Sequence, residues 1–136
     1  MKWIECLADL IFPRKCEICG RLLTGDERYI CEDCMEDMPL TYYWDWPENP
    51  AEKKLWVRTH LHRVIPLFFY TRESRYITLI HKIKYSGNTR LGVYMGKMLG
   101  GYVKKVLPDV DIIVPIPLHP RKKWKRGYNQ AEQIAI

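Results

Sequence analysis

Four cysteines in two pairs constrain this chain more than any other feature of its sequence. The pairs are Cys16-x2-Cys19 and Cys31-x2-Cys34, and eleven residues separate them. Two thiolates at this spacing can reach one metal ion, and a second pair completes the four tetrahedral ligands of a closed zinc site. The sequence therefore predicts a structural Zn²⁺ held by four thiolates, with no open position for catalysis.

Disulfides and redox-active thiols are the alternatives for these cysteines. Disulfides suit small secreted domains, but Glu5 and Asp9 interrupt the first apolar residues, unlike the core of a signal peptide. No run approaches the roughly 20 apolar residues that span a bilayer, so we expect a cytoplasmic protein without a membrane span. The fifth cysteine, Cys6, is interpreted as a small buried hydrophobe on a short N-terminal helix.

The chain divides into three predicted parts. Residues 1–38 form the N-terminal helix and zinc module, residues 39–60 a linker rich in proline and aromatic residues, and residues 61–136 a partial α/β domain. The linker aromatics could stack on the bases of a single strand, or pack onto the next domain, which we favour. They are Tyr42, Tyr43, Trp44 and Trp46.

The pattern of apolar residues predicts alternating elements in the rest of the chain. Helices are expected over 49–56, 75–85 and 90–107, and another from residue 129, with strands over 62–70 and 111–117. The second strand is apolar at nearly every position, which is typical of a strand buried on both faces of a parallel sheet. The fold class predicted is therefore α/β. The four histidines have no convincing ligand spacing, and we expect no direct role for them.

A basic segment follows the second predicted strand. Five of the six residues from Arg121 to Arg126 are basic, in a chain whose formal net charge is +6. In α/β proteins, ligands bind at loops after the carboxyl ends of strands, so we read residues 118–130 as a loop that binds an anion. The candidates for pyrophosphate are Arg121, Arg126, Gly127, Asn129 and Gln130, and those for nucleic acid are Lys122, Lys123 and Lys125. Asn129 could equally be the N-cap of the following helix.

Several of these segments together resemble one known family. Asp111-Ile-Ile-Val-Pro-Ile-Pro-Leu-His119, Arg126-Gly-Tyr-Asn-Gln130, Leu79-Ile-His-Lys-Ile-Lys-Tyr-x-Gly87 and the two cysteine pairs are similar, in the same order, to the ComF family. The resemblance implies a four-cysteine zinc finger joined to a type I phosphoribosyltransferase (Rossmann-like) domain. It also implies Mg²⁺ with phosphoribosyl pyrophosphate as substrate, and an association with DNA uptake in natural transformation.

The resemblance implies two functions for this chain. The first is a phosphoribosyltransferase-like protein that binds pyrophosphate or a phosphoribosyl ligand through the basic loop. The family's acidic pair before a Thr/Gly-rich loop is not found in the sequence, so we expect an N-terminal fragment or truncated product that is not catalytic alone. The alternative is a non-enzymatic, zinc-containing protein that binds single-stranded DNA. The sequence does not name an acceptor substrate or an oligomeric state.

Overall fold

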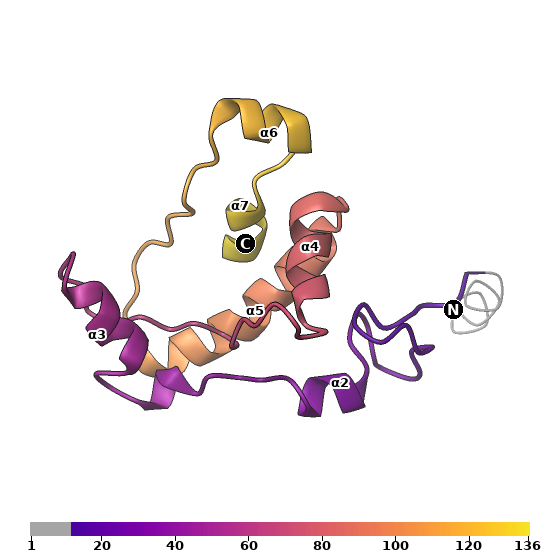
Figure 1. The fold of residues 1–136 in the computed structure, drawn as a ribbon, viewed down its shortest axis with the longest axis horizontal. Helices are drawn as coiled ribbons and strands as arrows, with labels where there is room; N and C mark the ends of the chain where they lie inside the picture. The colour runs from indigo at the N-terminus through magenta and orange to yellow at the C-terminus, as the bar shows by residue number, and fades with distance from the viewer. Residues whose placement is uncertain (1–11) are drawn as a thin grey trace.

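The computed structural model describes residues 12–136 as helices joined by irregular segments (Figure 1). The helices are α2 Glu32–Glu36, η1 Tyr43–Asp45, α3 Pro50–Trp56, α4 Ile77–Tyr85, α5 Thr89–Val106, α6 Pro120–Arg126 and α7 Gln130–Ala135. The predicted N-terminal helix and Cys6 lie outside the described residues. Within residues 12–136, no helix is both long enough and apolar enough to cross a membrane.

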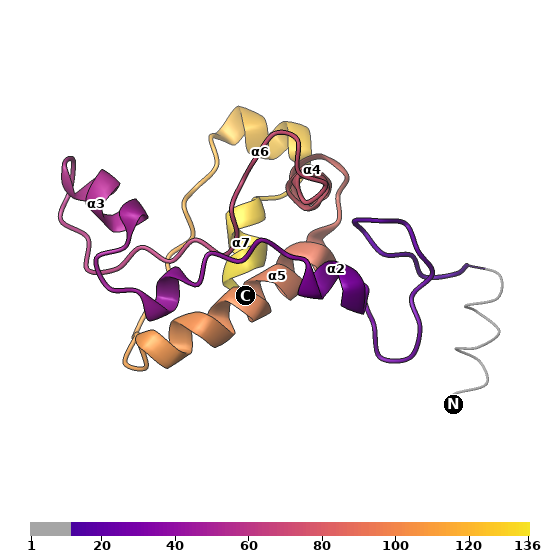
Figure 2. The same cartoon turned by 60° about the horizontal axis from the view of Figure 1, so that its bottom comes forward.

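The long helix α5 is the centre of the fold. Helices α4 and α7 and the short η1 all pack against it, and Figures 1 and 2 show them gathered along its length. Leu91 and Met95 of α5 are buried with Leu79 and Ile83 of α4. These positions lie on one face of each helix, as the helical period requires. The two predicted helices over 75–85 and 90–107 are confirmed, with their ends shifted by one or two residues.

The two predicted strands are wrong for the described part of the chain, which contains no sheet. Residues 62–70 make a single antiparallel bridge between Phe68 and Leu40. Residues 111–117 are extended but pair with no strand, and Ile112 to Val114 and Ile116 are exposed. A strand is stabilised by hydrogen bonds to a neighbouring strand. Within residues 12–136, no strand pairs with 111–117 to supply them.

Helices α5 and α7 approach each other so closely that a glycine is required between them. A Cβ atom on Gly96 would lie 2.1 Å from the backbone oxygen of Ile134. That atom belongs to the backbone of α7, so it cannot rotate away as a side chain would. Gly96 therefore sets the distance between the two helices. The glycines of α5 weaken an isolated helix, but this one allows α7 to dock.

We expect Gly96→Ala to lower the free energy of unfolding by about 1–3 kcal/mol, because the added methyl group forces the backbones of α5 and α7 apart. Gly101→Ala is the matched control in the same helix, since a Cβ atom there meets nothing within 4 Å. Alanine is a better helix former than glycine, so the control should be neutral or stabilising by up to about 1 kcal/mol. Thermal unfolding followed by circular dichroism measures both variants. Equal melting temperatures for the two would contradict the close crossing.

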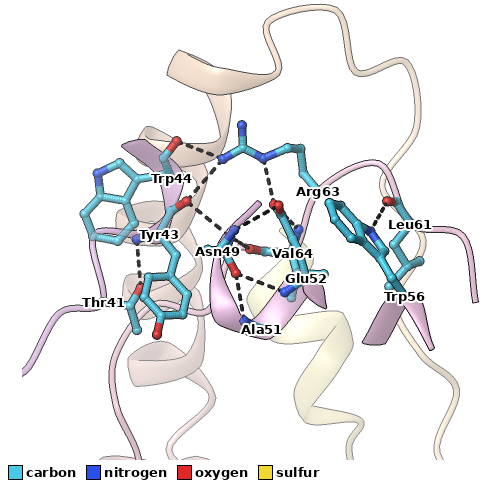
Figure 3. Close-up of polar contacts among 10 residues, drawn as sticks. All are labelled: Thr41, Tyr43, Trp44, Asn49, Ala51, Glu52, Trp56, Leu61, Arg63 and Val64. Atoms are coloured by element: carbon cyan, nitrogen blue, oxygen red, sulfur yellow. Dashed lines mark hydrogen bonds and ion pairs between the residues drawn. The ribbon is translucent and has the colours of Figure 1, made fainter. Parts of the chain in front are cut away.

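A buried polar network holds the segment between the zinc module and α4 (Figure 3). The Asn49 side chain caps α3 by accepting hydrogen bonds from the backbone N–H groups of Ala51 and Glu52. The Glu52 carboxylate in turn accepts from the Asn49 backbone N–H, which completes a capping box. Glu52 is only 1% exposed and pairs with Arg63 at 2.9 Å. Arg63 also donates to the backbone oxygens of Tyr43 and Trp44, each at 3.1 Å.

The aromatic residues of this segment divide into two groups. Trp44 is buried and stacks on Tyr102 of α5, with ring centroids 3.9 Å apart. This is the packing role that we favoured for the linker aromatics. Tyr42 and Trp46 are exposed. The packing of Trp44 attaches η1 to the central helix.

Candidate functional site

The four cysteines of the predicted metal site lie together in the structure. All four sulfur atoms are within 4.8 Å of one another, and the Sγ atoms of Cys19 and Cys31 are 3.6 Å apart. Four sulfurs bound to one zinc at about 2.3 Å would be about 3.8 Å from each other. A disulfide would need about 2.05 Å, and all four cysteines are free thiols. The donor set and its spacing therefore fit a tetrahedral Zn²⁺.

The backbone around the first pair is shaped for sulfur ligands. The N–H of Cys16 donates to the Arg21 oxygen at 2.7 Å, and the Gly20 N–H donates to the Cys16 oxygen at 2.9 Å. Gly20 has a φ of 76°, in the left-handed region that glycine adopts without steric cost. The Cys31 N–H points at the Cys16 sulfur, 3.4 Å away. The N–H groups of Ile18 and Cys19, within the turn, also face the Cys16 sulfur.

The acidities of the thiols differ within the cluster. Burial raises the pKa of Cys16, but the N–H groups of Cys19, Cys31 and Ile18 outweigh it and bring the pKa to about 6. Burial raises the pKa of Cys31 and that of Cys34, and for Cys34 the neighbouring thiols add to the rise. One thiolate forms readily while others keep their protons, so zinc must displace protons when it binds. The affinity for the metal should therefore fall as the pH is lowered.

The cysteine cluster is attached to α4 and α5 by one acidic residue. Glu17 lies between Cys16 and Cys19 and pairs with Lys82 of α4 at 2.6 Å. Its other oxygen accepts a hydrogen bond from the Asn88 side chain at 2.9 Å, and Asn88 is the N-cap of α5. On the other side of the cluster, the Tyr76 hydroxyl donates to the Cys34 backbone oxygen at 3.0 Å. Cys16, Cys31 and Cys34 belong to the same core as Leu79 and Leu91, while Cys19 is exposed.

The basic segment is a helix in the structure, so our expectation of a loop over 118–130 is wrong. His119 is the N-cap of α6, and its Nδ1 accepts from the Arg121 N–H at 3.3 Å. Pro120 occupies the first turn, where its missing N–H costs nothing. Gly127 ends α6 with a φ of 81°. His119, Pro120 and Gly127 are capping signals that could be read from the sequence. We did not use them, because we interpreted the run of charges as a loop.

The candidate anion ligands take different positions. The side chains of Arg121, Lys122, Lys123 and Lys125 are exposed on α6. Lys123 pairs with Glu132 of α7 at 3.1 Å. Arg126 is partly buried and donates to the Gln130 side chain at 2.9 Å.

Asn129 takes the capping role, one of the two that the sequence left open. Its oxygen accepts from the Ala131 N–H at 3.1 Å, and its amide donates to the Ile116 oxygen at 3.1 Å. The side chain is buried. It is therefore committed to positioning α7. Gly127, the C-cap of α6, lies two residues before it and is exposed.

A pocket of about 420 Å³ gathers positive charge between α4 and α6. Figures 1 and 2 both show the end of α4 beside α6, and the Tyr128 hydroxyl donates to the Ile83 oxygen at 2.5 Å. The residues that line the pocket are Lys84, Tyr85, Lys122, Lys125, Arg126 and Tyr128. Four cationic groups and two phenol rings thus face one space. Such a lining is suited to a phosphorylated ligand.

Lys84, Tyr85 and Tyr128 were not among the residues predicted for the site. Lys84 and Tyr85 lie within the segment from Leu79 to Gly87 that carries part of the family resemblance. That resemblance did not indicate that the segment shares a pocket with the basic residues more than thirty positions later. Only the packing of α4 beside α6 shows this.

Two comparisons with known proteins bear on this chain. Residues 7–43 match the model of a double zinc ribbon domain, and both cysteine pairs fall within that range. The chain is 24% identical over 124 residues to the DNA utilization protein YhgH of Salmonella typhi. That alignment covers 88% of the chain and 51% of the relative, so the chain spans about half the length of the curated relative it matches. No solved structure matches the chain.

The matches and the cysteine geometry agree on the N-terminal part. The clustered sulfurs have the spacing of zinc ligands, and the matching domain is a zinc ribbon by name. Together with the similarity to one DNA utilization protein, which covers 88% of the chain and 51% of that protein, they support a zinc-ribbon protein similar to the ComF family.

Proposed function

We propose that this chain is a zinc-stabilised protein that binds single-stranded nucleic acid through α6 and the basic pocket. Zinc bound by Cys16, Cys19, Cys31 and Cys34 has a structural role in this proposal, because four thiolates leave no open position. The observation that carries the proposal is the convergence of Lys84 with the cations of α6 on one pocket.

The surface of α6 has the features of a single-strand binding site. Such sites combine positive charge that follows the phosphates with aromatic rings on which bases stack. Trp124 is 90% exposed in the middle of the basic residues of α6. The relative named above is described as a DNA utilization protein, which makes DNA the first strand to test. Association with DNA-uptake proteins in the cytoplasm stays a prediction, as does the division of the chain at residues 38 and 60.

Removing the charges of the pocket should weaken binding strongly. We expect Lys84→Ala, Lys122→Ala and Lys125→Ala, combined in one variant, to lower the affinity for a fluorescein-labelled oligothymidylate by at least about tenfold. The slope of log affinity against log salt should shrink by about 2, because each lost phosphate contact removes about 0.7 from it. Fluorescence anisotropy at several salt concentrations measures both quantities.

A variant with the same change in net charge separates the site from general electrostatics. Lys53→Ala, Lys54→Ala and Lys104→Ala remove three exposed lysines from α3 and α5. This control should keep most of the affinity and most of the salt slope. If the two triple variants bind equally weakly, the pocket is not the site and the attraction is only that of a basic protein.

A small phosphorylated ligand is a second candidate for the same pocket. Its volume of about 420 Å³ falls within the range of small-molecule sites, and the resemblance of the sequence suggests pyrophosphate or phosphoribosyl pyrophosphate with Mg²⁺. The absence of a sheet in residues 12–136 removes the strand-end argument for this ligand, so it ranks second. Calorimetric binding of phosphoribosyl pyrophosphate with Mg²⁺, lost in the pocket variant, together with no binding of oligothymidylate would favour it. We expect no release of pyrophosphate by this chain alone.

A further inference from the structure

A second pocket lies next to the basic one and has a different lining. Its volume is about 440 Å³, and it is lined by Tyr70, Ile80, His81, Lys84 and Tyr85. Lys84 and Tyr85 also line the basic pocket, so the two spaces share a wall formed by the end of α4. Three aromatic rings and one aliphatic side chain surround a single lysine. The second pocket is therefore suited to a flat, weakly polar group.

Tyr85 is the ring that faces both spaces. Its side chain is 69% exposed, although two neighbours hold it. The Arg126 guanidinium lies 5.1 Å from the centre of its ring, and the His81 ring meets it edge to face at 6.0 Å. Arg126 is itself held by Gln130. Tyr85 is thus positioned by its surroundings while much of its surface remains open to a ligand.

We infer that the second pocket is a nucleobase subsite, and that the basic pocket beside it takes the adjoining phosphate. The inference rests on the proposed function and names how one nucleotide of the strand would lie. An exposed aromatic ring stacks on any base, because every base has a flat π-face. Lys84 borders both pockets and is placed to contact the phosphate that joins the base to the strand.

The lining also indicates which selectivity to expect. Tyr70, which is 56% exposed, and Ile80 offer ring and aliphatic surface, and His81 supplies an imidazole as a polar group. Reading a particular base requires several hydrogen bonds placed against its edge, and stacking alone does not provide them. The subsite should therefore require a base without strongly preferring one.

The test compares two labelled strands of equal length, an oligothymidylate and an abasic strand with the same phosphates. The unmodified chain should bind the oligothymidylate about tenfold more tightly or more, since stacking of one base is worth about 1–3 kcal/mol. Tyr85→Leu should lose most of this preference, measured as the ratio of its affinities for the two strands, because Tyr85 also lines the basic pocket and can contribute to both affinities alike. Tyr85→Phe keeps the ring and should keep the preference. Trp46→Leu removes an exposed aromatic ring at the C-terminal end of η1, and it should change neither affinity.

The outcomes separate this inference from the proposed function. Tight binding of both strands with no preference for bases, or a preference that survives Tyr85→Leu, would overturn the base subsite and leave the phosphate site intact. Loss of the preference in Trp46→Leu instead would place base stacking on the linker aromatics and also overturn it. If the unmodified chain binds neither strand, both the proposed function and the subsite are wrong. Zinc content and circular dichroism of each variant show that it has folded.

Discussion

Replacement of Cys34 by serine is expected to abolish zinc binding and to unfold the segment around the cysteine pairs. Cys34 is buried in the core with Cys31 and Leu79, and within described residues 12–40 the only helix is the five-residue α2. Structural zinc contributes about 10–16 kcal/mol of binding energy in small zinc-finger peptides, and that energy is folding energy. Chelation of the metal from the unmodified chain should have the same effect.

The unmodified chain should contain one zinc per chain, and Cys34→Ser none. Metal analysis, together with amide hydrogen exchange over residues 12–40, measures both expectations. Cys6→Ser is the control, because it makes the same chemical change outside the two C-x2-C pairs and should keep the zinc. A full complement of zinc in Cys34→Ser would falsify the four-thiolate site.

Loss of the metal should also reach the basic pocket. Glu17 ties the turn between Cys16 and Cys19 to Lys82, which lies on α4 two residues before Lys84 of the pocket. If that turn unfolds, the Glu17 carboxylate no longer holds Lys82 of α4 or Asn88, the N-cap of α5. A weaker affinity for oligothymidylate after chelation would follow from this connection, and replacement of zinc should restore it.

Replacement of Glu52 by alanine is expected to cost about 3–5 kcal/mol of unfolding free energy, the usual loss when one partner of a buried ion pair is removed. The largely buried Arg63 would keep its charge without a partner. The Val64 N–H donates to Glu52 at 3.1 Å and would lose its acceptor. Denaturation of the zinc-loaded chain in urea measures the change. Glu73→Ala, at an exposed position, should change the stability by less than about 0.5 kcal/mol.

The same network predicts a dependence of stability on pH. Burial raises the pKa of Glu52, but the Val64 N–H and the charge of Arg63 outweigh it, so the pKa is lowered in the folded chain. A lowered pKa means that the contribution is present above the pKa of the unfolded state and is lost as the pH falls through the folded one. Glu52→Gln should remove that part of the acid dependence. An unchanged acid-unfolding profile in Glu52→Gln would show that the ion pair does not control it.

Much of the fold was predictable because it depends on local patterns. The cysteine spacing and the chemistry of thiolates determine the metal site, since both pairs must meet at one ion. The helices α3, α4, α5 and α7 follow from apolar periodicity and from caps such as Asn49 and Asn88. The same reasoning applied to His119, Pro120 and Gly127 would have predicted α6, and it failed because we interpreted the charges as a loop.

The remaining features depend on contacts between distant segments. An apolar run such as Ile112 to Ile116 becomes a strand only beside a partner, and residues 12–136 provide none. Glu52 is polar by sequence, and only its placement against Arg63 buries it. The sequence by itself determined the zinc ligands, the principal helices and a basic segment. The tertiary structure decided that the end of α4 lies beside α6, because Tyr128 anchors to Ile83 and thereby brings Lys84 and Tyr85 to the basic helix.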